Sequence, residues 1–448
     1  MIAVSEVAIL DKIKLMAMLA IVPVTVYAQA GYGGPQVLSR SSSAVGERPG
    51  ANTGFQYYGG VGVGYETGIL PASVDEQGRI LDTGGLVSVW ASLGAYGRHT
   101  WRRTALGLDY AGSYRHYTTA SNWDSSDHVI GLQLAHQPSR RLRLETVTRA
   151  GTVSRYFVTG NASLSDIITP ANYALFDSRA YYLQTDTGIT YQKSARLYFT
   201  ASGQGFAVRH RSKDLVGLDG YGAQGAIAYR VNKRRTVEAS YRYTHIDYVR
   251  GFGESDMFIY MIGLSESIGK RWQFNVSGGA AQINSIGLES VATDPLTRAL
   301  FGNTTTVEAF SKQITVGAGT AALSGKFKTS TVTLSYNQMP SPGNGIYLTS
   351  RQQAAQAMYR YIGIRKVAVG AFMGYSQMRG IGQEALGNTW WANGGFDVAV
   401  KLHRSLEAIG RYDARSVQID AASGFSRLGY AVSFGLNWHP GEIPLSIW

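Results

Sequence analysis

The feature that most constrains this chain is a strict two-residue alternation of its side chains. From Leu428 to Trp438 every second residue is large and apolar, and the residues between them are small or polar. The same pattern recurs at 106–115, 237–243 and 396–402, where the second parity often carries charges of both signs. Such alternation indicates a β-strand with one face in an apolar medium and the other face in a polar medium.

Alternating segments fill the chain from residue 54 onward, and the connections between them are short and long in turn. The short connections are nearly all basic, as in QPSRR, VNKRR and IGKRW, whereas the long ones are rich in Gly, Asn, Asp, Ser and Pro. Strands joined in turn by a short connection and a long connection are typical of an up-and-down meander. About 18 strands are predicted, with about 16 as the alternative. They are expected to begin near Gly54, Leu86, Thr100, Asp127, Arg141, Arg179, Ala195, Tyr221, Arg235, Asp256, Arg271, Phe310, Thr329, Gln352, Val367, Trp391, Ser405 and Ser426.

Composition limits how so many strands can be housed. The 448 residues include 54 glycines and no cysteine, which excludes disulfides and thiolate metal or redox sites. Beyond residue 30 we find no run of about 18 apolar residues that could span a bilayer as a helix. A closed barrel suits the alternating strands because closure removes exposed edges. The predicted fold class is an all-β, transmembrane up-and-down antiparallel β-barrel with short periplasmic turns and long extracellular loops. A soluble exported β-protein is the alternative.

The N-terminus predicts export. Lys12 and Lys14 precede the apolar run LMAMLAIVPVTV, and YAQA offers small residues for cleavage after Ala28 or Ala30. An exported chain with this strand pattern is expected in the outer membrane of the cell. The predicted organisation is a signal peptide at 1–28, a flexible N-terminal periplasmic segment at 29–53, the barrel at 54–438 and a C-terminal extension at 439–448.

The leader, the alternating strands and the ending YAVSFGLNW together resemble the outer-membrane β-barrel proteins of Gram-negative bacteria, and the porin-like ones in particular. The ending resembles their C-terminal assembly signal, which implies recognition by the barrel-assembly machinery. The tail HPGEIPLSIW is a departure, since the terminal aromatic of the family is usually the last residue. Pro444 and Ser446 break the alternation before Trp448, so Trp438 is favoured as the functional end. The predicted signal residues are Tyr430, Val432, Phe434, Leu436 and Trp438.

Strand parity selects the charged side chains that should line a lumen. A surplus of Arg and Lys would favour anions, although most of these charges are expected to pair with one another and to stiffen the barrel. The predicted pore-lining or ligand-binding residues are Arg103, Asp109, Arg115, Arg143, Glu145, Arg149, Asp186, Arg196, Glu238, Arg242, Arg360, Asp397, Lys401 and Arg411. The loop at 155–179 is a candidate constriction, with Asp166 and Asp177 facing the arginines, and the long stretch at 285–308 is a rival.

The stretch NWDSSDHV could carry chemistry at a loop edge. It places Asp124, Asp127 and His128 beside Ser125 and Ser126, a set that could activate water or a hydroxyl. The alternative is a polar turn whose side chains satisfy the local backbone. The eight histidines are scattered, so spacing supports no metal site, and no cofactor is expected.

The formal net charge of +12 does not indicate nucleic acid, because the basic residues are spread one short connection at a time. These residues either meet anionic headgroups of the membrane lipid or simply keep the turns solvated. The favoured function is a porin-like channel for passive diffusion of small polar solutes, anionic or sugar-like, without enzymatic activity. Two alternatives stay open, a non-conducting barrel tied to surface exopolysaccharide export or anchoring, and a barrel-embedded hydrolase. A homo-oligomer is compatible with the channel and with both alternatives.

Overall fold

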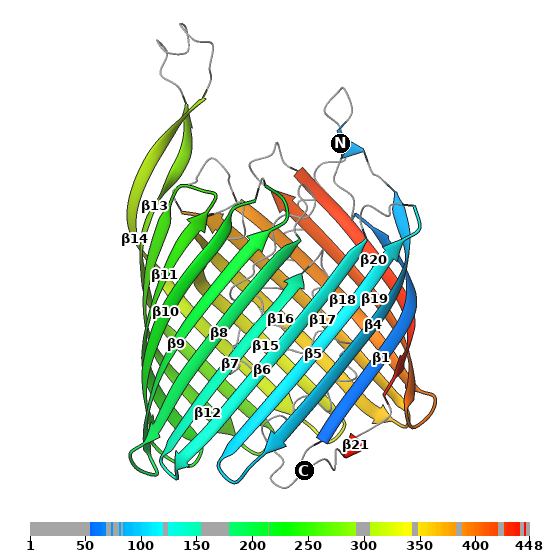
Figure 1. Ribbon diagram of the computed structural model, residues 1–448, viewed down its shortest axis with the longest axis horizontal. Helices are drawn as coiled ribbons and strands as arrows, with labels where there is room; N and C mark the ends of the chain where they lie inside the picture. The colour runs from blue at the N-terminus through cyan, green and yellow to red at the C-terminus, as the bar shows by residue number, and fades with distance from the viewer. Residues whose placement is uncertain are drawn as a thin grey trace, which may run out of the picture.

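The computed structural model describes residues 54–68, 73–74, 80–81, 84–119, 124–153, 179–213, 215–292, 305–342, 348–381, 388–419, 425–439 and 443–444. In this part of the chain eighteen long strands form one barrel (Figure 1). They are β1 (Gly54–Thr67), β4 (Gly85–Thr100), β5 (Thr104–Tyr117), β6 (Ser125–Ser139), β7 (Leu142–Val153), β8 (Ala180–Gln192), β9 (Leu197–His210), β10 (Gly217–Arg230), β11 (Arg235–Val249), β12 (Glu254–Ile268), β13 (Trp272–Ala292), β14 (Thr305–Lys326), β15 (Ser330–Ser341), β16 (Ser350–Ile364), β17 (Val367–Gly380), β18 (Asn388–Lys401), β19 (Leu406–Ile419) and β20 (Phe425–Trp438).

The strands follow one another around the barrel in chain order, and each is antiparallel to its neighbours. Strand β1 closes the barrel by pairing with β4 on one side and β20 on the other. The predicted fold class and the number of strands are therefore confirmed. A short hairpin of β2 (Ser73–Val74) and β3 (Ile80–Leu81), in the connection between β1 and β4, was not predicted.

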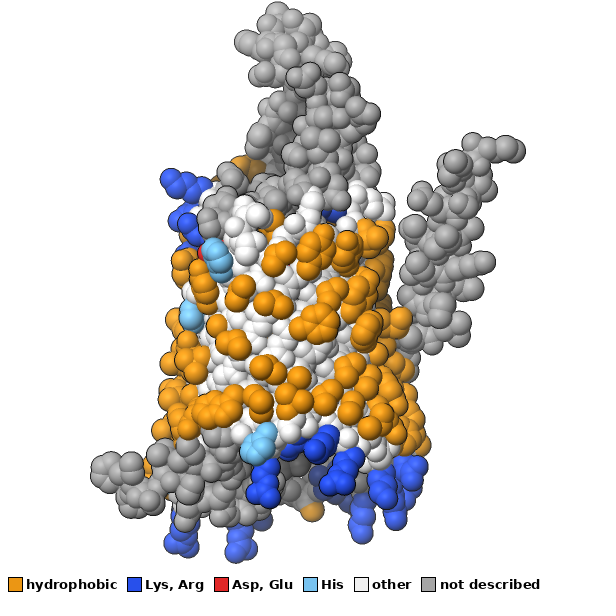
Figure 2. Space-filling model, turned by 90° about the vertical axis from the view of Figure 1, so that its right-hand side faces the viewer, with side chains coloured by type: hydrophobic (Ala, Val, Ile, Leu, Met, Phe, Trp, Pro, Cys, Tyr) orange, Lys and Arg blue, Asp and Glu red, His pale blue; other side chains and the backbone are white. Residues whose placement is uncertain are grey.

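The outer surface of the barrel is apolar. On β1 and β20, for example, Val61 is 58% exposed and its cross-strand neighbour Leu436 is 45% exposed. Figure 2 shows such side chains as a band around the middle of the barrel. A continuous exposed apolar band on a closed barrel is the surface that lipid hydrocarbon accommodates. Within the described ranges, no helix has the length and apolar character needed to cross a membrane.

Short turns lie at one end of the barrel, and the longer connections lie at the other end (Figure 1). An even number of strands places the start of β1 and the end of β20 at the same end, which is the end with the short turns. By the usual orientation of such barrels this end faces the periplasm.

The hairpin of β13 and β14 is longer than its neighbours and projects beyond the rim of the barrel (Figure 1). Its two strands stay in register as far as the pair Ala292 and Thr305. The prediction that 285–308 is a loop folding into the lumen is therefore wrong, because 285–292 and 305–308 continue the strands. The other candidate, 155–178, lies outside the described residues.

The C-terminal tail pairs with the first strand. Strand β20 ends at Trp438, as predicted, opposite Gly59 of β1. The first residues of β1 extend beyond that point, and β21 (Ile443–Pro444) pairs with Gly54 and Phe55 there. The tail thus continues the ladder along the same edge of β1 after the chain has left β20.

Candidate functional site: the barrel lumen

Strand parity decides which side chains enter the lumen. The positions that alternate with the exposed apolar residues face inward, and twelve of the predicted pore-lining residues occupy them. Arg103 and Arg196 do not, because they lie in the short turns before Thr104 and Leu197, the first residues of β5 and β9. Arg103 donates to the carbonyl of Pro138 across 3.1 Å. Placing these two arginines on strands was an error of strand boundary.

An ion pair lies on the inner face of β1, β4 and β5. Glu66, which is 2% exposed, pairs with Arg115. The hydroxyl of Tyr117 donates to Glu66 Oε2 at 3.4 Å, and Arg115 donates to Ser88 Oγ at 3.5 Å. Removal of charges from water is costly unless they are paired and hydrogen-bonded, and both conditions are met here.

A second charged row crosses β5 to β8. Asp109, Gly131, Arg149 and Gln184 lie opposite one another in the registers of these strands. A side chain at Gly131 would collide with the Asp109 carboxylate, so glycine at this position leaves the space that the carboxylate occupies. Arg149 interacts electrostatically with Asp109 and with Asp186, which accepts a hydrogen bond of 2.7 Å from Gln184.

Arg149 is the least satisfied group of this row. Its side chain is 5% exposed, yet Nε and one terminal nitrogen have no hydrogen-bond partner among the described residues. Buried polar groups in proteins are nearly always hydrogen-bonded, and a buried charge needs compensation. The positive charge of Arg149 is therefore only partly compensated by its described neighbours.

A third charged group lies on β16 to β19. Arg411 makes two hydrogen bonds of 2.7 Å to the carboxylate of Asp413, and its guanidinium lies 5.2 Å from the ring centroid of Phe372. Asp397, on β18, interacts electrostatically with Arg360 and Arg411. On this side, the charges of Arg411 and Asp413 form an ion pair.

The wall formed by β12 to β15 is different, because it carries few charges. Among the described lumen-facing side chains, none on β12, on β13 as far as Gly287 or on β15 is charged, and β14 has Glu308, Lys312 and Lys326. Ile259, Ala281 and Ala318 are buried there and form a packed apolar cluster. The lumen thus has a charged side and an apolar side.

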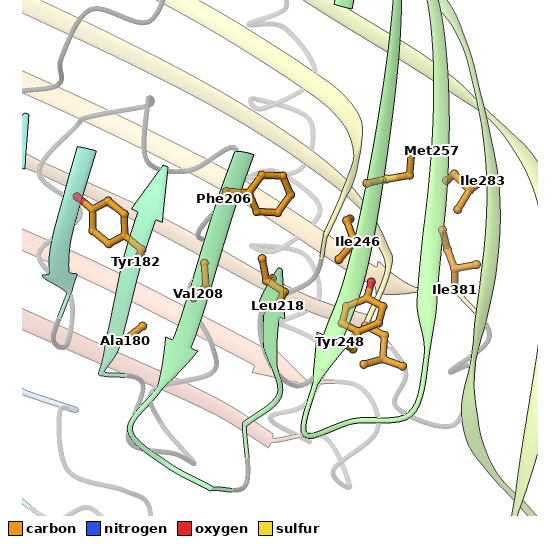
Figure 3. Close-up of a cluster of buried hydrophobic side chains, with 11 residues drawn as sticks. Ala180, Tyr182, Phe206, Val208, Leu218, Ile246, Tyr248, Met257, Ile283 and Ile381 are labelled. Carbon is orange, nitrogen blue, oxygen red and sulfur yellow. The ribbon is translucent and has the colours of Figure 1, made fainter. Parts of the chain in front are cut away.

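The residues just before β16 contact the inner wall at β11 and β12. The hydroxyl of Tyr248 on β11 bonds that of Thr349, just before β16, at 2.7 Å, and Thr349 also bonds Ser255 on β12. Leu348 and Ile381 join a buried cluster with residues of β8 to β13 (Figure 3). The described contacts of Leu348, Thr349 and Ile381 with the inner wall were not identified by sequence reasoning.

The residues of NWDSSDHV point in two directions. Ser125 and Asp127 lie on the lumen parity, whereas Ser126 and His128 face outward near the extracellular rim. Ser126 Oγ lies 2.6 Å from His128 Nε2, and the hydroxyl of Tyr110 lies 2.9 Å from His128 Nδ1. The expected constellation is therefore divided by the barrel wall, and its outward half forms a Ser–His–Tyr chain.

Asp124 belongs to a separate network at the same rim. Its carboxylate accepts hydrogen bonds of 2.8 Å from the Tyr114 hydroxyl and 2.9 Å from the Tyr117 amide, and it lies 2.8 Å from His116 Nδ1. Burial alone would raise the pKa of Asp124, but these three hydrogen bonds outweigh it and lower the pKa below its ordinary value.

A group that could hold a metal ion lies on the outward face of β11 and β12. The ligand atoms of His245, Asp247 and Glu254 lie within 4.8 Å of one another. Asp256 also contacts His245 Nδ1 at 2.9 Å. The spacing of the histidines in the sequence suggested no metal site. Residues 245 and 247 lie on the same face of β11, and β12 returns beside them. The register of this hairpin would therefore have indicated the group.

The closed barrel and the apolar outer band define a transmembrane β-barrel, and its lumen carries charged side chains. No protein-family model matches the sequence, and no curated protein matches it.

Three solved structures have a similar architecture, and the first of them is of an outer membrane protein. OpdK from Pseudomonas aeruginosa is 11% identical, with 86% of this chain and 99% of that chain covered and a TM-score of 0.41. OpdQ from Pseudomonas aeruginosa is 12% identical, with 88% and 98% covered and a TM-score of 0.43. OccAB2 from Acinetobacter baumannii is 12% identical, with 87% and 98% covered and a TM-score of 0.42. These values describe a general likeness of barrels.

Proposed function

We propose that the barrel is a passive diffusion channel for small polar solutes and that it favours anions. The observation that carries the proposal is Arg149, a buried lumen-facing guanidinium with two unpaired donors. Barrels of about 16–18 strands leave room for an aqueous path unless they are plugged. The inward charged side chains are then the pore lining, and the positive charge of Arg149 attracts a passing carboxylate or phosphate.

The physical reason is the cost of the unsatisfied guanidinium. A hydrogen bond to a charged group contributes about 1.5–3 kcal/mol, which is enough to favour entry of an anion without trapping it. Arg115 and Arg411 cannot serve in this way as readily, because each already has a carboxylate partner.

Conductance across planar bilayers tests the proposal. Under a salt gradient the purified barrel should conduct with a reversal potential that favours chloride. Arg149→Gln should shift that potential toward cations, Arg149→Lys should retain most of the selectivity, and Lys233→Gln in a short turn should leave it unchanged. A folded barrel that does not conduct, or selectivity that is independent of Arg149, would contradict the proposal.

One observation favours a second candidate function, hydrolysis of lipid esters at the outer rim. The contact of Ser126 with His128 pairs a nucleophile with a base, and Tyr110 orients the ring. Gly112 leaves the space that this contact needs, since a side chain there would collide with the Tyr110 hydroxyl. The pair lies at the upper edge of the apolar band, directly above Ile130 on the same strand face.

In such a reaction the Ser126 oxygen would attack the ester carbonyl carbon while His128 Nε2 takes the hydroxyl proton. The bond to the leaving alcohol would break as His128 returns that proton to the alcohol, and water would then release the acyl group from Ser126 by the same route. A fluorophosphonate probe should label Ser126 in the folded barrel. His128→Gln should abolish the labelling, whereas Ser125→Ala, on the inner face, should not. Absence of labelling at Ser126 would eliminate this function.

A further inference from the structure

The eight short turns at the periplasmic end form a ring of positive charge. Together they hold fourteen lysines and arginines and no aspartate or glutamate. The chain has 42 Lys and Arg against 30 Asp and Glu, so the remaining 28 basic residues are slightly outnumbered by acidic ones. The whole positive charge of the protein is therefore concentrated at this rim. The members are Arg102, Arg103, Arg140, Arg141, Lys193, Arg196, Lys233, Arg234, Lys270, Arg271, Lys328, Arg365, Lys366 and Arg404.

The ring lies directly below the apolar band, as Figure 2 shows for one face of the barrel. Aromatic side chains mark the boundary between the two. Trp101 packs against His99 with ring centroids 4.2 Å apart, and Trp272 packs edge-on against Phe327 at 5.3 Å. The guanidinium of Arg271 lies 5.8 Å from the centroid of Phe327. Aromatic residues at this level are typical of the membrane–water interface.

Side chains other than the basic ones hold the backbone in three of the turns. In three of the turns Ser139, Ser194 and Asn232 accept two backbone N–H groups each, at 2.8–3.2 Å. None of the ion pairs of the described residues involves a member of the ring; Arg235, at the first position of a strand, pairs with Glu266 instead. The ring charges therefore remain available to an external anion.

We infer that this ring binds the phosphate headgroups of anionic phospholipids in the periplasmic leaflet. Every short turn around the circumference contributes, and a shell of lipid surrounds a barrel on all sides, whereas a docked protein would contact one side. A basic side chain near an anionic leaflet contributes about 1 kcal/mol, or about a fivefold preference per charge.

The test uses the purified full-length barrel in bilayers of phosphatidylcholine with brominated phosphatidylglycerol or brominated phosphatidylcholine. Quenching of tryptophan fluorescence gives the relative association constant of the two lipids. We expect the wild type to prefer phosphatidylglycerol by several-fold at low salt, and high salt to reduce the preference because it screens exposed charges.

Neutralisation of four turns, at 102–103, 140–141, 233–234 and 365–366, to glutamine should bring the constant close to one. The matched control is Arg211→Gln with Lys213→Gln, which removes basic charge in the connection at the opposite end. If the eight-charge variant fails to fold, a variant with only the first two of these turns neutralised should give an intermediate value. Equal affinity of the wild type for both lipids would overturn the inference. So would an unchanged preference in the folded variants, or abolition of the preference by soluble glycerol phosphate, which would assign the ring to a free anion.

Discussion

The two sides of the lumen differ in chemistry although the same strand geometry builds both. The side formed by β5 to β8 and β16 to β20 presents arginines and carboxylates, whereas β12 to β15 present small, hydroxyl and aliphatic side chains. The segment that enters the lumen rests at the apolar side, where Tyr248 and Ser255 hold Thr349. A connection can dock stably where it displaces water from apolar surface.

The largest expected effect comes from placing a charge on the apolar side. Ile283 is fully buried in the cluster against which Leu348 packs. Ile283→Lys should lower the free energy of unfolding by about 4 kcal/mol, because the ammonium group has no partner there. Urea titration in detergent measures this value. Ser113→Lys, on the charged side, is the control, and an equal loss in both variants would mean that the two sides do not differ.

The second effect tests the charged side itself. Glu66→Gln leaves Arg115 buried without its partner, which should cost about 3 kcal/mol. The same urea titration measures it. Replacement of both residues, by Glu66→Gln with Arg115→Met, should recover most of the loss. A double variant as unstable as the single one would show that packing, and not the uncompensated charge, is responsible.

A smaller effect is expected where the entering segment is held. Tyr248→Phe removes the hydrogen bond to Thr349 and should cost about 1 kcal/mol of unfolding free energy. Because the segment is then held less firmly, single-channel conductance should rise or become noisier. Tyr260→Phe, on the lipid-facing side of β12, should change neither quantity. Identical recordings for the two variants would argue against a constricting role of the segment.

The smallest effect is expected at Asp124, which lies at the extracellular rim and belongs to neither side of the lumen. It provides a reference for the effects expected on the two sides. The pKa of this carboxyl is lowered in the folded protein, so its contribution to stability is complete above its unfolded pKa and is lost as pH falls through the folded pKa. Asp124→Asn should therefore cost a few tenths of a kcal/mol at neutral pH, since the group is partly exposed. The difference from wild type should shrink as pH falls through the folded pKa. A pH-independent difference would assign the effect to geometry.

The strands could be predicted from the sequence because their period of two is set locally. All eighteen begin within five residues of the predicted positions, and parity correctly assigned Asp109 and Arg149 to the same face. The errors arose where local pattern ends. Arg103 and Arg196 were assigned to strands, but they lie in the turns just before β5 and β9. The reason is that a turn residue can continue the alternation of the strand that follows.

The contact of Tyr248 with Thr349 could not be predicted, because it joins residues 101 positions apart across the lumen. Nothing in the local composition of 342–349 distinguishes a connection that enters the lumen from one that stays outside. The same limit applies to the outward Ser126–His128 pair. In the sequence, Asp127 stands beside these two residues. Only the structure shows that Asp127 lies on the lumen parity while Ser126 and His128 face outward.

The pairing of β21 with β1 offers a way to follow assembly. Gly54 and Phe55 extend past the end of β20, and residues 443–444 pair with them beside the seam between β1 and β20. The tail therefore depends on the first strand for its own partner. Protection of residues 443–444 from proteolysis would report that the tail and β1 have paired, without any probe inside the membrane.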